Sequence, residues 1–285
     1  MLFRSAAGAE LLRRLCAPAG DPLAPPRTLL ALAHPDDESV GASSRLTRIE
    51  VAALVYATDG APRDGRIPRD AGCETIADYA AMRRAETLRA LAHAGISSER
   101  AVFLDYPDQE AAYRLLPLAA DLRRWMIATR PEIVLTHPYE GGHPDHDAVA
   151  FAVHAAVAAL ASEAEQPPTI IEFTSYHAHN DAVAFGEFLC AGESPSCTVR
   201  LTDDGRALKQ RLLACHRSQT HKWNSLPLNE ERFRLAPAYD FTRPPHDGPL
   251  LYERHGHGVT VDEWCELVSV ASEQLARTLQ TCVLK

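Results

Sequence analysis

The sequence predicts an α/β fold in which a mainly parallel sheet is covered by helices on both faces. Three observations predict this fold class: apolar runs short enough for buried strands, Ala- and Leu-rich stretches long enough for helices, and the alternation of the two over the first 160 residues. Strands that are separated by helices usually pair in parallel, because the helix returns the chain to the edge of the sheet at which the previous strand began.

The individual elements follow from apolar runs and from the residues that interrupt them. Strands are expected at residues 27–33, 51–57, 101–104, 133–136, 170–175 and 198–201, and helices at residues 74–94, 113–129, 146–160 and 203–215. Pro25 and Pro26 prevent a helix from running into the first strand, and Gly95 is placed to end the first of these helices. Residues 1–20 are expected to form an amphipathic helix rather than a signal peptide, since the stretch lacks a continuous apolar segment and contains Glu10.

The remaining segments complete one expected domain of residues 1–285, with its core at about residues 27–220. Residues 61–72 are predicted to form a polar loop. Residues 222–285 comprise a Pro-rich region, expected to be irregular up to residue 258, and then an amphipathic C-terminal helix.

Composition and charge exclude several classes of protein. The net charge of -9 is unfavourable for a surface that follows nucleic-acid phosphates, which needs a basic face. No apolar run is long enough to span a bilayer. The seven cysteines are scattered and contain no CxxC pair, which favours reduced thiols in the cytoplasm over a disulfide framework. A metal ion in this protein must therefore be held by histidine and carboxylate side chains.

Two clusters of histidine and carboxylate residues directly follow two of the expected strands. Residues 33–38 (AHPDDE) come after the first strand, and residues 137–147 (HPYEGGHPDHD) come after the strand at residues 133–136. The carboxyl ends of parallel strands lie along one edge of a sheet, where ligands bind in such folds, so the two clusters are expected to meet. Two histidines and one aspartate with open coordination positions are typical of catalytic zinc, although the same set can hold Fe(II).

The spacing within each cluster indicates a division of roles without fixing it. Asp36 and Asp37 are adjacent at a strand end and point in different directions, so one can bind the metal while the other faces a metal-bound water. His143 and His146 are three residues apart at a helix start and share one face, so one can bind the metal while the other points toward substrate. Either cluster alone could also be a turn in which proline fixes the backbone and aspartate caps a helix. Two such clusters at equivalent strand ends favour the metal site.

Together the clusters resemble the PIG-L/LmbE-like family of N-acetylglucosaminyl deacetylases, through residues 33–38 and residues 142–146 (GHPDH). The resemblance extends over roughly residues 27–220 and implies a Rossmann-like α/β fold. It also implies hydrolysis of an N-acetyl group from a glucosamine-type sugar, with zinc as the cofactor and Fe(II) as the alternative metal.

The resemblance assigns roles to seven residues of this sequence. The three implied zinc ligands are His34, Asp37 and His146. Asp36 matches the general base, His143 matches the histidine that stabilises the tetrahedral intermediate, and Asp145 matches the carboxylate that orients this histidine. Arg83, in an Arg-x-x-Glu setting with Glu86, matches an arginine that contacts substrate hydroxyls; the alternative is an exposed ion pair on a helix.

One position departs from the thiol-cofactor branch of the family. That branch has a tyrosine two residues before the first histidine of the second motif, where it helps to stabilise the intermediate, and this sequence has Gly141 there. The departure argues against a tyrosine-assisted mechanism and against a mycothiol-type substrate. Residues 215–219 (CHRSQ) are similar to a His-x-Ser-Gln stretch of the family. The histidines left without a role are His177, His179, His216, His255 and His257.

The function expected from the sequence is the zinc-dependent removal of an N-acetyl group from an N-acetylglucosamine-type sugar or glycoconjugate, with release of acetate. Zinc would polarise the amide carbonyl, Asp36 would take a proton from the attacking water, and protonated His143 would stabilise the oxyanion. The alternatives are an amidase acting on a larger acyl group or conjugated amide, a sugar-binding protein on the same scaffold, and an iron-dependent oxygenase. The expected partner is a small acetylated sugar, and a homo-oligomer formed through the Ala-rich helices is left open.

Overall fold

A seven-stranded sheet forms the centre of the computed structural model, which describes residues 2–18, 20–163, 166–180, 182–189 and 194–283. Its strands are β1 (Arg27–Leu32), β2 (Glu50–Thr58), β3 (Ala101–Tyr106), β4 (Ile133–Thr136), β5 (Thr169–Phe173), β8 (Ser196–Arg200) and β9 (Glu230–Leu235). They lie in the order β3-β2-β1-β4-β5-β9-β8. Strands β1 to β5 pair in parallel, whereas β9 is antiparallel to both of its neighbours. A separate hairpin joins β6 (Tyr176–His179) to β7 (Ala182–Phe185).

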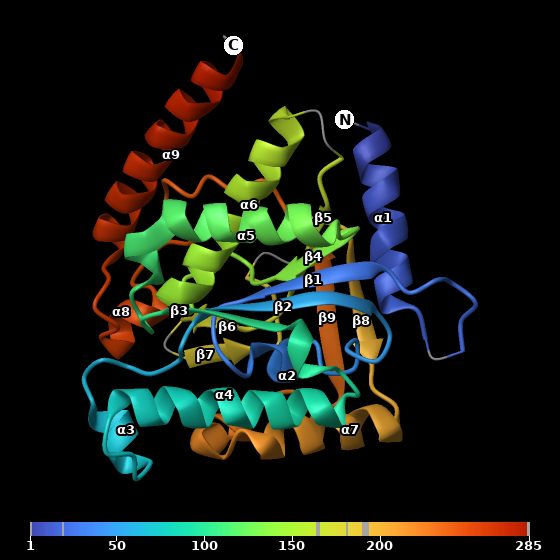
Figure 1. Cartoon of the computed structure of the whole chain (residues 1–285), viewed down its shortest axis with the longest axis vertical. Coiled ribbons are helices and arrows are strands. Elements are labelled where there is room, and N and C mark those ends of the chain that lie inside the picture. The colour runs from blue at the N-terminus through green and yellow to red at the C-terminus, as the bar shows by residue number, and fades with distance from the viewer. Residues whose placement is uncertain (1, 19, 164–165, 181, 190–193, 284–285) are drawn as a thin grey trace.

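Helices cover both faces of this sheet (Figure 1). One face carries α5 (Leu115–Thr129), α6 (Pro144–Ser162) and α9 (Val261–Val283), and the other carries α1 (Leu2–Cys16), α4 (Ile76–His93) and α7 (Asp203–Cys215). Short helices fill the connections, namely α2 (Asp37–Gly41), α3 (Arg66–Asp70), α8 (Leu251–His255) and the 3-10 turns η1 (Ser98–Arg100), η2 (Ala111–Arg114) and η3 (Arg217–Ser225). The prediction of a Rossmann-like α/β fold with a mainly parallel sheet is confirmed.

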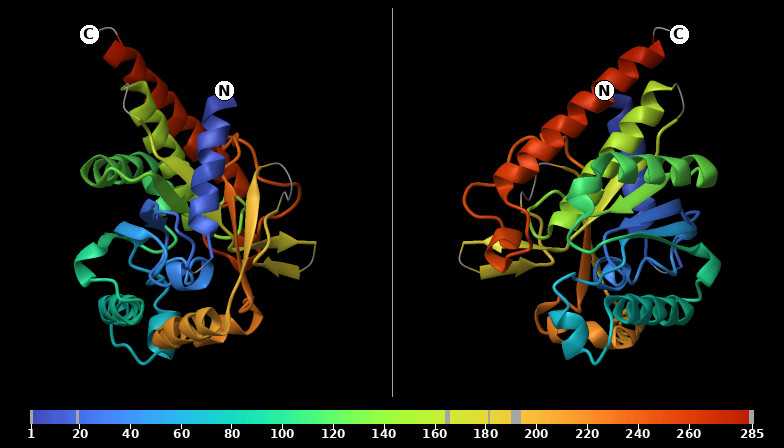
Figure 2. Two further views of the ribbon diagram at one scale, coloured as in Figure 1. Left: turned by 90° about the vertical axis from the view of Figure 1, so that its right-hand side faces the viewer. Right: turned by 60° about the vertical axis from the view of Figure 1, so that its left-hand side comes forward.

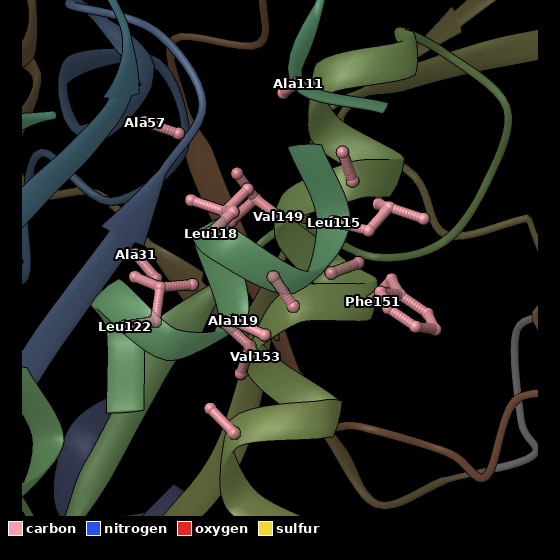
Figure 3. Packing of buried hydrophobic residues seen from close by; sticks show 14 of the residues in the cluster. Ala31, Ala57, Ala111, Leu115, Leu118, Ala119, Leu122, Val149, Phe151 and Val153 are labelled. Atoms are coloured by element: carbon pink, nitrogen blue, oxygen red, sulfur yellow. The ribbon is translucent and has the colours of Figure 1, made fainter. Parts of the chain in front are cut away.

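Alternate residues of the central strands supply two separate hydrophobic cores. In β1, Leu29 belongs to the core under α5 and α6, whereas Leu30 belongs to the core under α1, α4 and α7. Figure 3 shows the first core at close range, where Leu118 of α5 lies beside Val149 of α6 and Leu122 of α5 lies beside Ala31 of β1. Each fully buried leucine contributes about 1.5–3 kcal/mol to folding. Burial on both faces explains why these strands are continuous apolar runs in the sequence.

The expectation that residues 222–258 are irregular is wrong in three places, because the end of η3, β9 and α8 lie within them. β9 has the sequence EERFRL, and its charged residues are not typical of a buried strand, so the sequence does not predict it. In the structure these charges are paired in the interior: Glu231 accepts a hydrogen bond from the Ser44 hydroxyl at 2.5 Å, and Arg234 donates to Glu172 at 2.7 Å. Only the folded chain brings these partners together.

The loop at residues 61–72 differs slightly from the prediction, whereas the C-terminal helix agrees with it. The loop contains the one-turn helix α3. α9 packs Trp264 and Val268 into the core, as its apolar stripe predicts, and extends past the end of α6 (Figure 2). Among the described helices, none combines the length and apolarity that a bilayer crossing requires.

His154 on α6 is predicted to make the protein less stable at acidic pH. Burial lowers the pKa of His154 from 6.5 to about 4, and its ring packs against Tyr239 and Phe241. Between these two pKa values the unfolded chain binds the proton and the folded chain does not, so lowering the pH favours unfolding. Between about pH 7 and pH 4.5 the free energy of unfolding should fall in both the wild type and His154→Phe. The loss should be about 2 kcal/mol smaller in His154→Phe. Urea denaturation at both pH values measures this, and equal losses in the two proteins would contradict it.

Candidate metal centre

The sheet brings the two histidine and carboxylate clusters to one point. β1 and β4 are parallel neighbours, with Leu30 opposite Leu135, and each cluster follows directly after its strand. From β1 the chain builds one half of the sheet through β2 and β3, and β4 begins the other half, so the clusters lie at the switch point where such sheets bind ligands.

His34, Asp37 and His146 turn one donor atom each toward a common point, and all three side chains are buried. Nδ1 of His34 lies 3.2 Å from Nε2 of His146. The Asp37 carboxylate lies 3.6 Å from Nε2 of His146 and 3.9 Å from Nδ1 of His34. Donor atoms around a tetrahedral zinc ion at about 2.0–2.1 Å lie about 3.3 Å apart. The three residues that the sequence proposes as ligands therefore have the spacing that a metal ion requires.

Asp37 is held in its ionised form. Nε2 of His137 lies 3.1 Å from Oδ2 of Asp37, and the backbone N–H of His34 donates to the same oxygen at 2.7 Å. Burial alone would raise the pKa of Asp37, but His137, His146 and His34 hold it well below the usual range. An ionised carboxylate is ready to bind a cation. His137 has no role in the sequence-based assignment; it is stacked on His146, with ring centroids 4.0 Å apart.

The second ring nitrogen of His34 faces two carboxylates. Nε2 lies 3.1 Å from Asp145 and 3.1 Å from Asp108. Burial lowers the pKa of His34, but hydrogen bonds to Asp108 and Asp145 outweigh it and raise the pKa to about 10. When a metal ion displaces the proton of Nδ1, these carboxylates keep the remaining hydrogen on Nε2. Asp108 carries no motif in the sequence, and only its position just after β3, a third strand end at this edge, could have indicated it.

Asp145 contacts both histidines that border the site. Its backbone N–H donates to Nδ1 of His143 at 3.2 Å, and its carboxylate lies 3.8 Å from that nitrogen. The carboxylate also accepts the backbone N–H groups of Gln109 and Ala111 at 2.7 and 3.0 Å. Burial raises the pKa of Asp145 to about 6. The sequence expects Asp145 to orient His143, and the structure adds His34 as a closer partner of its carboxylate.

His143 caps the N-terminus of α6. Because Nδ1 accepts the backbone N–H of Asp145, the ring hydrogen of neutral His143 lies on Nε2. The ring stands between two others, with centroids 4.5 Å from His34 and 4.7 Å from His257. His143 can therefore donate a hydrogen bond to a substrate without first becoming an imidazolium ion.

Asp36 lies next to the donor group in a backbone conformation with φ 148°, which is strained for a residue with a side chain. Its carboxylate accepts a hydrogen bond from Arg83 at 2.7 Å. Arg83 also donates to the carbonyl oxygens of Pro35 and Gly60 at 2.8 and 2.7 Å. A Cβ at Gly60 would lie 2.3 Å from Nη1 of Arg83, so only glycine leaves room for this contact. Arg83 is 3% exposed, and the exposed pair with Glu86 does not form.

His216 and Ser218, from the CHRSQ stretch, form hydrogen-bond contacts with α2 and α4, respectively. Glu86 accepts hydrogen bonds from the backbone N–H and the hydroxyl of Ser218 at 3.0 and 2.6 Å. Nε2 of His216 lies 3.1 Å from the hydroxyl of Ser39, which follows the first cluster. Since α4 carries Arg83, these contacts help to fix the arginine beside the site.

Three further histidines lie apart from the donor group. His177 is buried with Nδ1 3.4 Å from Glu140, whereas His179 and His255 are exposed. In the part of the chain that the structure describes, none of the three belongs to a group of residues that could hold a metal ion.

Comparison with known proteins extends these observations. Residues 29–157 match the family model described as PIG-L: GlcNAc-PI de-N-acetylase. A deacetylase of the teicoplanin biosynthesis pathway is similar in structure with a TM-score of 0.57 and 17% identity, covering 75% of this chain and 99% of that chain. The A40926 pseudoaglycone deacetylase Dbv21 has a TM-score of 0.56 and 15% identity, covering 76% of this chain and 100% of that chain. The N,N'-diacetylchitobiose deacetylase from Pyrococcus horikoshii has a TM-score of 0.51 and 22% identity, covering 77% of this chain and 82% of that chain. No curated protein sequence matches the chain.

We expect Asp145→Asn to weaken zinc binding by about 10- to 100-fold, because it removes a carboxylate that keeps the hydrogen of His34 on Nε2. Competition with a chromogenic chelator measures the affinity, and circular dichroism checks the fold. Asp105→Asn is the control, since Asp105 is an exposed carboxylate that pairs with Arg84. Equal zinc affinities in the two variants would contradict the assignment.

Proposed function

We propose that the chain is an N-deacetylase of the PIG-L family, whose model it matches over residues 29–157, and that it hydrolyses the N-acetyl group of an N-acetylglucosamine-type sugar or glycoconjugate. The convergence of His34, Asp37 and His146 carries the proposal. Beside these residues lies Asp36, a carboxylate outside the donor group. Metal-assisted amide hydrolysis uses both a metal ion and a base, whereas a module that only binds sugar needs neither.

Zinc is the metal that we propose for His34, Asp37 and His146. Two imidazoles and one carboxylate suit zinc in a catalytic site, with Fe(II) as the alternative for the same donors. When bound, zinc supplies a Lewis acid that polarises the amide carbonyl and lowers the pKa of water. The ionised state of Asp37 and the fixed ring of His34 prepare the donors for such an ion.

The residues of the chain carry the proton transfers. Asp36 accepts a proton from water while the water oxygen forms a bond to the acetyl carbon. Nε2 of His143 donates a hydrogen bond to the former carbonyl oxygen as negative charge develops there. The bond from carbon to nitrogen then breaks, Asp36 returns its proton to the leaving amine, and acetate and the free amino sugar are the products.

Arg83 supports this chemistry by holding the base. Its hydrogen bonds to Asp36 and to the carbonyl oxygens of Pro35 and Gly60 keep the Asp36 carboxylate in one orientation. A positioned base removes the need to order the side chain during the reaction. The contact of Arg83 with substrate hydroxyls, expected from the sequence, stays a prediction.

We expect the zinc-loaded protein to release acetate from N-acetylglucosamine conjugates, and Asp36→Asn to lower kcat by about 100- to 10,000-fold. Asparagine keeps a hydrogen-bond acceptor for Arg83 and tolerates a positive φ, so the fold should persist. The measurement is acetate release from N-acetylglucosamine, N,N'-diacetylchitobiose and glucosamines with longer acyl groups, together with the zinc content of each protein.

Asp105→Asn again serves as the control and should retain wild-type turnover. Full activity in Asp36→Asn would show that another group is the base. Hydrolysis of only the longer acyl groups by the wild type would overturn the deacetylase proposal in favour of an amidase.

A further inference from the structure

The region after β9 reaches the candidate metal centre, although it lies outside the family match at residues 29–157. The backbone N–H of Leu251, the first residue of α8, donates to the carbonyl oxygen of Gly141 at 2.9 Å. Leu250 and Leu251 are both buried. The loop that carries His143 is therefore covered by a segment from the C-terminal part of the chain.

The same contact explains the glycine at position 141. Gly141 has φ +68°, and a Cβ at this position would lie 2.8 Å from Cδ2 of Leu250. A larger residue would be strained and would displace Leu250. The space in which a side chain at position 141 would begin is thus filled from the C-terminal region.

His257 comes to the site through the turn that ends α8. Gly256 adopts φ 69°, and the backbone N–H of His257 then donates to the carbonyl oxygen of Tyr252 at 3.0 Å. This turn brings the imidazole of His257 against that of His143, with centroids 4.7 Å apart and planes at 52°. His143 also contacts His34, with ring centroids 4.5 Å apart, so the ring of His143 links His257 to the donor group.

We propose that His257 contacts the substrate and binds the sugar next to His143. This inference rests on the proposed function, in which His143 faces the acetyl oxygen. His257 is half-buried, whereas His143 is buried, so of the two adjacent rings that of His257 is the more accessible to a substrate. An imidazole offers one donor and one acceptor, which suit the hydroxyl groups of a sugar.

A residue in this position affects binding rather than the chemical step. Its contacts with the sugar are the same before and during amide cleavage, so their loss raises KM and leaves kcat nearly unchanged. A residue that only packed against His143 would instead disturb the orientation of His143 and lower kcat.

The kinetic test compares His257→Ala and His257→Phe with His93→Ala, using acetate release from N-acetylglucosamine by the zinc-loaded full-length protein. His93 is an exposed histidine at the end of α4 and is the control. We expect KM to rise about tenfold in both His257 variants, with kcat within about twofold and His93→Ala unchanged. Phenylalanine keeps a ring against His143 but lacks hydrogen-bonding atoms, so a wild-type KM in His257→Phe overturns the proposal. A lower kcat at unchanged KM also overturns it.

A binding measurement separates this inference from the proposed function. Calorimetric titration of N-acetylglucosamine into the zinc-loaded Asp36→Asn protein should show affinity about tenfold lower, or about 1.4 kcal/mol, when His257→Ala is added. Equal affinities overturn the role of His257 even if the wild type is an active deacetylase. If the wild type cleaves no acetylated sugar but the His257 effect on binding is present, the deacetylase proposal fails and the sugar contact stands.

Discussion

The whole site depends on β1 and β4 lying side by side as parallel neighbours. Leu30 and Leu135 pair at the centre of the sheet with no exposed surface, so the distance between the two strands is fixed by backbone hydrogen bonds and by packing on both faces. The chain extends the sheet in opposite directions from these strands, which leaves the loops after them free to converge. Three donor atoms that come from distant parts of the sequence thereby acquire the spacing of a metal site.

This convergence places many ionisable groups inside the protein, where an unpaired charge would cost several kcal/mol. Three of the acidic residues have a partner that is cationic or donates a hydrogen bond: Asp36 pairs with Arg83, Asp37 accepts the backbone N–H of His34, and Asp145 pairs with the His34 ring. The strained backbone at Asp36 adds a cost of about 1–3 kcal/mol. The two hydrophobic cores supply the stability that offsets these costs, and the result is a set of side chains whose orientations are determined before any substrate arrives.

The sequence predicts an element or a site residue when the residue types and their spacing along the chain are enough to identify it. The strands of the parallel sheet are apolar because they are buried on both faces, and the two clusters stand out because histidine and aspartate are dense at strand ends. β9 could not be recognised, since its Glu231 and Arg234 are buried through pairing with Ser44 and Glu172. For a related reason Asp108 was missed, and His137 received no role although it belongs to the second cluster. Their contacts with the site depend on which loops meet in three dimensions, and no motif records that.

The contacts of the C-terminal region with the site could not be predicted from the sequence either. Under our proposal, this region contributes to substrate selectivity. The groups proposed for metal binding and proton transfer come from residues 34–37 and 143–146, which follow β1 and β4 at strand ends that the sheet determines. Leu250 and His257 come from a segment that the sheet does not determine, yet they fill the space beside Gly141 and reach His143. A change in this segment can alter the surface that meets the sugar without moving the donor atoms, because its contacts with the site pass through the loop at residues 139–143. With the roles proposed here, the chemistry and the choice of substrate are encoded in separate parts of the chain, and only the first part carries a motif.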